Sequence, residues 1–264
     1  MLRIRIAILL VILSFSHRLT AQPADCSISH NIFRSGEKVT YRAFYNWGFI
    51  WITAADVIFT VNDTVYDGKD CYHLKSVSSN LKQYDWFYKV RERFESIIKK
   101  DSLKPYWFLR ESYEGGYVAY NNYLYDYKSN RLKISSYTSD RRYKEEQLTL
   151  KPCTFDVLSA IYFCRNINFS ALTNDERMPL TMAIDNEVVD LYLKFLGRET
   201  ITLHDGKTYD TFKFSAMLVK GTIFKGGEDL FVWVTNDNYH IPVMVEAKIL
   251  IGSVKAILVG VEGV

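Results

Sequence analysis

Three carboxylates stand next to aromatic residues, and they are the side chains that most resemble a catalytic set. Glu111 and Glu114 flank Tyr113, while Asp85 precedes Trp86. A glycosidase needs two carboxylates about 5–10 Å apart on one cleft wall, one of them acting as a general acid. The same residues are also typical of a solvated strand surface. A polysaccharide hydrolase or lyase that uses paired carboxylates is therefore one alternative function.

Other catalytic templates are missing from the sequence. No G-x-S-x-G segment is present, which excludes the serine elbow of the α/β-hydrolases. The histidines after the first 21 residues lie far apart, without the H-x-x-x-H spacing of a zinc peptidase: His30, His73, His204 and His240. The glycine pairs at 115–116 and 226–227 indicate turns, not phosphate cradles. We therefore expect no cofactor, no metal site and no assignable catalytic residue.

Aromatic side chains are the most distinctive candidates for binding a ligand. Tyr123, Tyr125 and Tyr127 alternate along the chain, so in a strand their rings would share one face. Tyr84, Trp86 and Tyr88 repeat that spacing. A third group, Trp47, Phe49 and Trp51, surrounds Gly48 and could lie in a loop at the mouth of a cup. The candidate ligand-binding residues are therefore Trp47, Phe49, Trp51, Trp86, Tyr123, Tyr125 and Tyr127. Cross-strand packing on a half-buried sheet, or a core corner around Gly48, explains the same pattern.

The first 21 residues have the layout of a secretory signal peptide. Arg3 and Arg5 precede an apolar run over residues 6–15, and Ala21 provides the small residue for cleavage. The run is about half of the roughly 20 residues that span a bilayer, and no later run comes closer. We expect cleavage after Ala21, no transmembrane segment in the mature chain, and a periplasmic or outer-envelope location.

Charge argues against nucleic acid as a partner. The chain has 33 basic and 30 acidic residues, but three of the arginines (Arg3, Arg5 and Arg18) belong to the predicted signal peptide. The mature chain is then balanced, with no excess of positive charge to attract phosphates. Lipid, glycan or other envelope proteins are the partners that remain.

Four cysteines would enter an oxidising compartment, where disulfides persist: Cys26, Cys71, Cys153 and Cys164. A helix between Cys153 and Cys164 would separate them by about 14–16 Å, too far for a bridge. If two bridges form, Cys26 and Cys71 each pair with one of those two. Two or more buried free thiols are the other interpretation, and the sequence leaves the connectivity open.

The elements that must position these residues are mostly strands. Residues rich in Val, Thr, Tyr and Phe recur between turn signals such as Asp67-Gly68 and Asp205-Gly206. The expected strands cover residues 37–45, 51–61, 71–78, 87–98, 107–113, 117–127, 131–137, 143–150, 180–184, 188–196, 200–203, 208–218, 230–235, 241–249 and 254–261. One segment, residues 154–165, has helical spacing, with Thr154 or Asp156 as its N-cap.

This order of elements indicates antiparallel meanders. Strands follow one another without intervening helices, and no Pro- or Ser-rich linker divides the chain. We predict a mainly β protein, a large curved antiparallel sheet or open half-barrel with one packed helix at about residues 154–165. Residues 22–264 are expected to form a single all-β domain.

Several segments resemble the bacterial family known as domain of unknown function 3108. They are residues 36–41, 45–48, 85–91, 103–105, 155–160, 232–235, 241–243 and 251–253. The resemblance covers nearly all of the mature chain. It implies no established activity and no catalytic residue, and it implies a curved antiparallel sheet similar to the half-barrel cup of periplasmic lipoprotein carriers, by analogy of fold alone.

Export, aromatic patterning and missing catalytic templates together favour a binding protein. We expect an exported cell-envelope protein without catalytic activity that binds a hydrophobic or amphipathic ligand, lipid or glycan, on the concave face of its sheet. The hydrolase or lyase described above is one alternative. The other is a structural or partner-binding envelope module that uses sheet edges.

Overall fold

The computed structural model describes residues 26, 28, 31–47, 50–218, 227–248 and 253–264. The predicted signal peptide, residues 1–21, lies outside the described residues. Among the described residues, fifteen strands form one sheet and one α-helix packs on it. The strands are β1 (Lys38–Trp47), β2 (Ile50–Tyr66), β3 (Lys69–Asn80), β4 (Val90–Lys99), β5 (Pro105–Glu114), β6 (Tyr117–Asp126), β7 (Arg131–Thr138), β8 (Arg141–Thr149), β9 (Thr154–Phe155), β10 (Arg177–Ile184), β11 (Glu187–Thr202), β12 (Thr208–Leu218), β13 (Gly227–Thr235), β14 (Pro242–Lys248) and β15 (Ser253–Glu262). The helices are α1 (Val157–Arg165) and the short 3₁₀ turns η1 (Lys82–Tyr84) and η2 (Phe169–Ala171).

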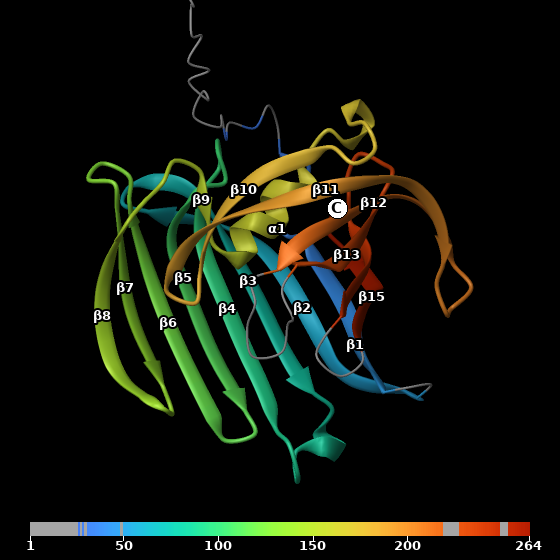
Figure 1. Ribbon diagram of the computed structural model, residues 1–264, viewed down its shortest axis with the longest axis horizontal. Coiled ribbons are helices and arrows are strands. Elements are labelled where there is room, and N and C mark those ends of the chain that lie inside the picture. The colour runs from blue at the N-terminus through green and yellow to red at the C-terminus, as the bar shows by residue number, and fades with distance from the viewer. Residues whose placement is uncertain (1–25, 27, 29–30, 48–49, 219–226, 249–252) are drawn as a thin grey trace, which may run out of the picture.

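The sheet is curved, and its strand order places the first and last strands side by side. Neighbours run β8-β7-β6-β5-β4-β3-β2-β1-β15-β14-β13-β12-β11-β10-β9, so two meanders meet at the β1–β15 ladder. The strands pair antiparallel except for β9, which runs parallel to β10. Figure 1 shows the sheet curling around α1, and β11 comes back to contact β8. The predicted large curved sheet with one packed helix is confirmed, and the sheet stays open rather than closing into a barrel.

Helix α1 begins at Val157 because Asp156 caps it. The Asp156 carboxylate accepts a hydrogen bond from the Ser159 amide at 2.9 Å, and the Ser159 hydroxyl accepts one from the Asp156 amide. This capping box fixes the first turn. The expected start at residue 154 is three residues early, since Thr154 and Phe155 pair with β10. Within the described part of the chain, no helix combines the length and the apolar character that crossing a bilayer requires.

The cap predicts a pH dependence. Burial raises the pKa of Asp156 from 3.8 to about 6, against the lowering effect of its hydrogen bonds from Ser159 and Ser96. Between pH 4 and 6 the unfolded chain releases this proton and the folded chain keeps it. The Asp156 contribution to the free energy of unfolding should therefore fall by on the order of 3 kcal/mol as the pH rises through that window.

Urea titrations of wild type and Asp156→Asn at pH 4 and pH 7 test this expectation. Asparagine can still accept the bond from the Ser159 amide but has no proton to release. Relative to wild type, the variant should have a higher free energy of unfolding at pH 7 than at pH 4. A constant difference would contradict the raised pKa.

Helix α1 packs against β3, β4, β9 and β10, and this defines the inner face of the sheet. Leu158 and Tyr162 belong to one buried cluster with Val61, Leu74 and Ile98. Alternate residues of each strand point to this side because side chains alternate across a sheet. The helix covers only one end of the inner face.

Two segments differ from the strands expected from the sequence. The segment from Phe87 was predicted to be strand, but β4 begins at Val90, because residues 82–88 form η1 and the turn after it. The two strands expected at 188–196 and 200–203 are one strand, β11, with a register shift between Phe195 and Gly197. Gly197 has a φ of +103°, which is open to glycine but strained for other residues.

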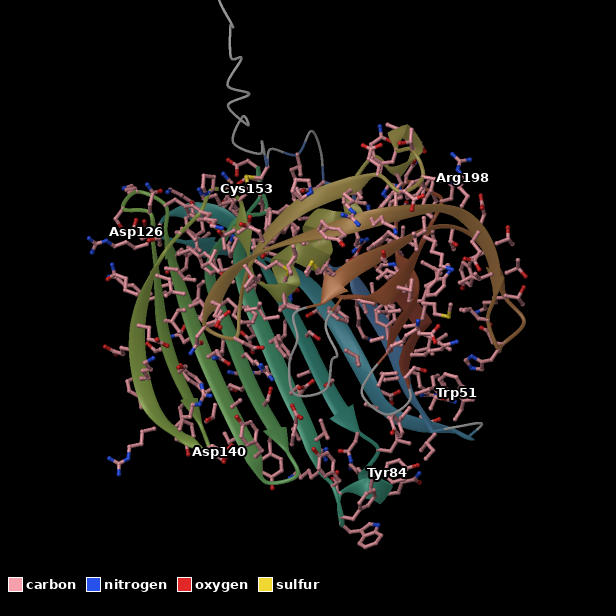
Figure 2. All side chains as sticks on the ribbon, in the orientation of Figure 1. Trp51, Tyr84, Asp126, Asp140, Cys153 and Arg198 are labelled. Carbon is pink, nitrogen blue, oxygen red and sulfur yellow. A yellow bond between two sulfur atoms is a disulfide. The ribbon has the colours of Figure 1, made fainter. Side chains whose placement is uncertain are left out.

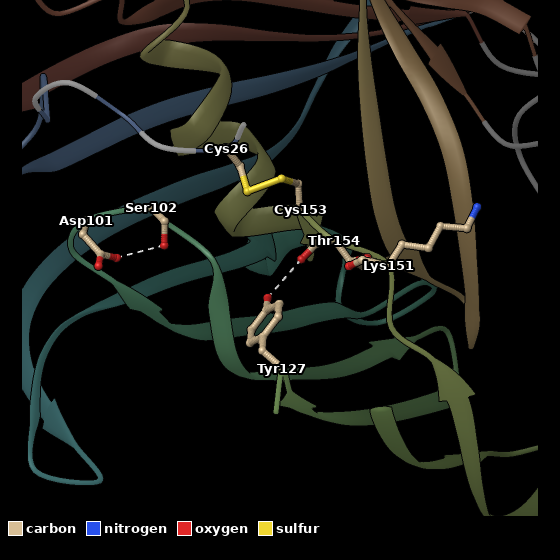
Figure 3. Close-up of a disulfide and its surroundings, with 7 residues drawn as sticks. All are labelled: Cys26, Asp101, Ser102, Tyr127, Lys151, Cys153 and Thr154. Carbon is tan, nitrogen blue, oxygen red and sulfur yellow. Dashed lines mark hydrogen bonds between the residues drawn. A yellow bond between two sulfur atoms is a disulfide. The ribbon is translucent and has the colours of Figure 1, made fainter. Parts of the chain in front are cut away.

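A disulfide joins Cys26 to Cys153, across 127 residues of sequence, with Cα atoms 5.7 Å apart. It ties the start of the described chain to the residues just before β9 and α1 (Figure 3). The other two cysteines, Cys71 and Cys164, are free thiols. The connectivity that the sequence left open is therefore one bridge and two free thiols.

A buried ion pair fixes the other end of α1. The Arg165 guanidinium donates to both Glu37 carboxylate oxygens at 2.6 and 2.9 Å, and to the Tyr239 carbonyl at 3.1 and 3.2 Å. Glu37 is 1% exposed and Arg165 3%. Arg165 lies in the last turn of α1, where a positive charge also complements the helix dipole. Its side chain joins the segment before β1, the helix and the turn before β14.

Candidate binding site on the inner face

The candidate site is the part of the inner face that α1 leaves uncovered. Under the helix, inner residues such as Val61 and Leu74 have no exposed surface. Further along the same strands, inner residues such as Val57 and Ser78 are half-buried. The sheet thus presents a stretch of its inner face that no other element fills among the described residues.

One side of this stretch consists of small apolar side chains in register. Ala43 lies opposite Ala55 of β2 and opposite Ala256 of β15, and Ala256 lies opposite Val245 of β14. A second row of paired residues runs through Ile52, Tyr45, Val254 and Ala247. We call the residues of these rows and their neighbours on the same face the apolar wall, which comprises Ala43, Tyr45, Ile52, Ala55, Val57, Ala216, Leu230, Val245, Ala247, Val254 and Ala256. With the exception of the more exposed Ile52, these residues are half-buried. Short side chains leave room above the sheet for an apolar group.

The other side of the stretch is polar. Glu92 of β4 accepts hydrogen bonds from the Ser78 hydroxyl at 3.1 Å and the Ser112 hydroxyl at 3.5 Å. Arg110 donates to the Ser112 hydroxyl at 3.0 Å. Together with Glu114, these residues form the polar wall. The polar wall adjoins the apolar wall, because Val57 lies opposite Ser78 in the β2–β3 ladder. An apolar surface beside a polar one suits an amphipathic ligand.

Glu114 and Glu92 form a carboxyl pair on the polar wall. Partial burial, together with the charge and hydrogen bond of Glu92, raises the pKa of Glu114. The two residues are diagonal neighbours on adjacent strands, because Glu92 lies opposite Ser112 and Glu114 lies opposite Val90.

The carboxylate set singled out in the sequence is not assembled in the fold. Glu111 and Glu114 differ by an odd number of positions in β5, so they lie on opposite faces of the sheet. Glu111 pairs with Arg93 at 3.0 Å on the outer face. Asp85 pairs with Arg91 at 2.5 Å. Glu92, which sequence reasoning did not single out, is the residue that joins Glu114.

The turn between β10 and β11 separates the polar wall from the covered core. Asp185 accepts a bond from Arg110 at 3.3 Å. The Asn186 side-chain amide donates to the Ser136 hydroxyl at 2.8 Å, and the Asn186 backbone amide donates to the Tyr123 hydroxyl at 3.0 Å. Both turn residues have a positive φ, which Asn and Asp tolerate better than most residues. The turn therefore bridges one end of the sheet to β5, β6 and β7.

The three alternating tyrosines do share the inner face, as their spacing predicts. Tyr123 and Tyr125 are only 1% and 5% exposed and belong to a core cluster with Phe108 and Ile134. Tyr127 lies just past the end of β6, where its hydroxyl donates to the Thr154 carbonyl at 3.4 Å (Figure 3). Their rings are packed in the covered part of the face, so they do not border the uncovered stretch.

The tryptophans lie at the other end. Trp51 is exposed near the start of β2, and Trp86 is exposed in the turn after η1. Tyr84, Trp86 and Tyr88 do not form the expected strand face, because η1 and its turn contain them. Trp47 ends β1, and its side chain, like all of Phe49, lies outside the described residues.

We call the aromatic group at this end the aromatic rim. It consists of the exposed residues Trp51, Ile52, Trp86, Phe87 and Tyr88 and the half-buried Tyr84. Figure 2 shows Trp51 and Tyr84 at the end of the molecule opposite to Cys153. Ile52 belongs both to this rim and to the apolar wall. Its neighbour Trp51 points to the opposite face of the sheet, where its ring lies 5.1 Å from the Lys255 ammonium.

A second hollow lies on the outer face. It is a shallow groove of about 650 Å³ across β2 to β6, lined by residues that include Ile58, Val77, Arg93, Glu111 and Tyr120. Its charged groups pair with one another, as in the Arg93–Glu111 contact at 3.0 Å.

The chain is similar to proteins whose function is not known. A family model described as "Protein of unknown function (DUF3108)" matches residues 40–259. A similar solved structure is that of a β-barrel-like protein of domain of unknown function DUF1849 from Brucella abortus. The two chains share 8% sequence identity, with a TM-score of 0.56 over 86% of this chain and 97% of the other. That similarity concerns the fold alone. No curated protein matches the chain significantly.

Proposed function

Because the chain belongs to the DUF3108 family, which is described only as proteins of unknown function, we propose its function from the geometry of the inner face. The protein binds a hydrophobic or amphipathic ligand, lipid or glycan, between the apolar wall and the polar wall. The carrying observation is the in-register run of small apolar residues that no element covers in the described chain.

The same proposal includes export to the cell envelope. Residues 1–21 act as a signal peptide that is cleaved after Ala21, and the protein works in the periplasm or at the outer envelope. The Cys26–Cys153 disulfide supports this location, because such bonds persist in oxidising compartments. Binding without catalysis is the role that we favour, since Glu111 and Glu114 lie on opposite faces of the sheet and Asp85 is paired with Arg91.

Filling the apolar wall tests the proposal. Ala43→Phe places a ring in the middle of the wall, where it should lower the affinity for the fluorescent probe N-phenylnaphthylamine at least tenfold. Phenylalanine suits a half-buried strand position, so we expect the cooperative unfolding transition to remain. Fluorescence titration measures the affinity, and native mass spectrometry of protein purified from its own envelope measures co-purified ligand.

Val77→Phe is the matched control. Val77 lies on the outer face of β3 and lines the outer groove, so a ring there adds the same bulk away from the apolar wall. Its affinity for the probe should equal that of wild type. Probe binding that survives Ala43→Phe and fails in Val77→Phe would move the site to the outer groove and overturn the proposal.

A further inference from the structure

The loop between β3 and β4 is built to hold its aromatic residues outward. Asn80, buried at the end of β3, donates to the Tyr88 carbonyl at 2.8 Å and accepts from the Val90 amide at 2.9 Å. Within the loop, the Phe87 and Tyr88 amides both donate to the Tyr84 carbonyl, at 3.1 and 3.0 Å. The backbone is thus held by its own hydrogen bonds, and the exposure of the rings is a property of the folded loop.

The rings in this loop are unusually exposed for their type. Trp86 is 85% exposed and Phe87 62%, although both side chains gain free energy on leaving water. They contact each other, with ring centroids 5.3 Å apart, and Phe87 contacts Tyr84 at 6.0 Å. A contiguous apolar patch on a fixed loop indicates a surface that a partner covers.

A second exposed segment lies at the same end of the sheet. The Leu81 amide donates to the Ala54 carbonyl, which places the loop beside the first residues of β2. Trp51 and Ile52 are exposed there. Figure 2 shows that Trp51 and Tyr84 lie at the same end of the molecule. The aromatic rim therefore spans two hairpins at one end of the sheet.

The charges beside the rim are positive. Arg91 neutralises Asp85, the acidic residue of the loop, at 2.5 Å. Lys82 and Lys89 flank the aromatic residues and are exposed. Tryptophan, tyrosine and lysine together are typical of the membrane–water interface, where rings enter the headgroup layer and ammonium groups meet lipid phosphates.

We propose that the aromatic rim docks onto the surface of an anionic phospholipid bilayer. This inference rests on the proposed function, because Ile52 belongs to both the rim and the apolar wall, so docking brings that end of the inner face to the bilayer surface. The rim inserts its rings into the headgroup layer, and Lys82 and Lys89 contact lipid phosphates. The chain needs no membrane-spanning element for this attachment.

Vesicle flotation tests the docking. The protein, produced from its full-length sequence and purified from cells, is mixed with vesicles of phosphatidylcholine containing one-third phosphatidylglycerol. The double variant W86S/F87S should bind these vesicles at least tenfold more weakly than wild type. The double variant K82Q/K89Q should lose about fivefold per lysine at low salt, and wild-type binding should weaken as salt rises. All the proteins carry the same N-terminus, so their differences report on the rim.

Y137S/Y143S is the matched control, since it removes two exposed aromatic residues from the outer face of β7 and β8. The exposed fraction of Tyr143, 59%, is similar to the 62% of Phe87. This control should bind vesicles as wild type does. Equal binding by wild type and W86S/F87S would overturn the proposal. The proposal would also be overturned if wild type bound vesicles without phosphatidylglycerol as strongly as it binds anionic vesicles. Binding to an envelope protein that depends on the rim, without any binding to vesicles, would overturn it as well.

The probe titration keeps this proposal separate from the proposed function. Loss of vesicle binding in W86S/F87S with an unchanged affinity for N-phenylnaphthylamine in solution is the result expected if the rim docks and the inner face binds. A wild type that binds the probe but not the vesicles overturns docking alone. A wild type that binds vesicles through the rim but never binds the probe overturns the ligand site alone.

Discussion

Replacing Glu37 by glutamine should lower the free energy of unfolding by about 3–5 kcal/mol. The reason is that Arg165 keeps its charge and remains buried, with 3% of its surface exposed, while its carboxylate partner is gone. The glutamine oxygen and the Tyr239 carbonyl could still accept from the guanidinium, but the glutamine NH2 group would replace one of the two carboxylate acceptors and no negative charge would remain. Urea denaturation followed by circular dichroism measures the loss.

Two further variants separate the buried charge from the contact itself. Glu262→Gln breaks the exposed Lys38–Glu262 pair, 2.7 Å long, and should cost less than about 1 kcal/mol. The double variant E37L/R165M removes both buried charges and should recover most of the stability that Glu37→Gln loses. If Glu37→Gln lowers the free energy of unfolding no more than Glu262→Gln does, the buried Glu37–Arg165 pair does not stabilise the fold more than an exposed pair.

Removing the Cys26–Cys153 disulfide is expected to lower the unfolding free energy by about 2–5 kcal/mol. The bridge closes a loop across 127 residues, and a long loop restricts the unfolded chain strongly. C26S/C153S should therefore unfold at lower urea concentration than wild type. The bridge also anchors the segment before β1, so proteolysis near the N-terminus should become faster.

Reduction provides the control for this variant. Wild type treated with dithiothreitol should match the untreated C26S/C153S protein, and the variant itself should be insensitive to the reagent. Cys164→Ala, which removes a free thiol, should leave the sensitivity of wild type unchanged. A wild type equally stable with and without the reductant would refute a stabilising role for the bridge.

The sequence predicted the strands well because their signal is local. Alternating β-branched and aromatic residues end at turn signals, and Asp67-Gly68 lies where the β2–β3 hairpin turns. The segment at residues 82–88 was missed because its aromatic residues alternate as in a strand. What decides its conformation is Asn80, which bonds to the backbone at Tyr88 and Val90. That contact exists only in the folded hairpin.

The candidate site was less predictable than the fold. Aromatic residues draw attention in a sequence, yet Tyr123 and Tyr125 are core residues. The apolar wall is made largely of alanine and valine, which carry no functional signal of their own. Its signal is the cross-strand register, such as Ala43 opposite both Ala55 and Ala256. Register between β1 and β15 depends on pairing the two ends of the chain, which local patterns do not reveal.

The same ladder has a consequence for how the protein is made. During synthesis β1 emerges before the other strands and its neighbour β15 emerges after them, so one edge of β1 has no native partner until β15 has been made. An unpaired edge of this kind recruits other chains. We expect chains that stop before Ser253 to aggregate, since they leave β1 and β14 without their shared neighbour.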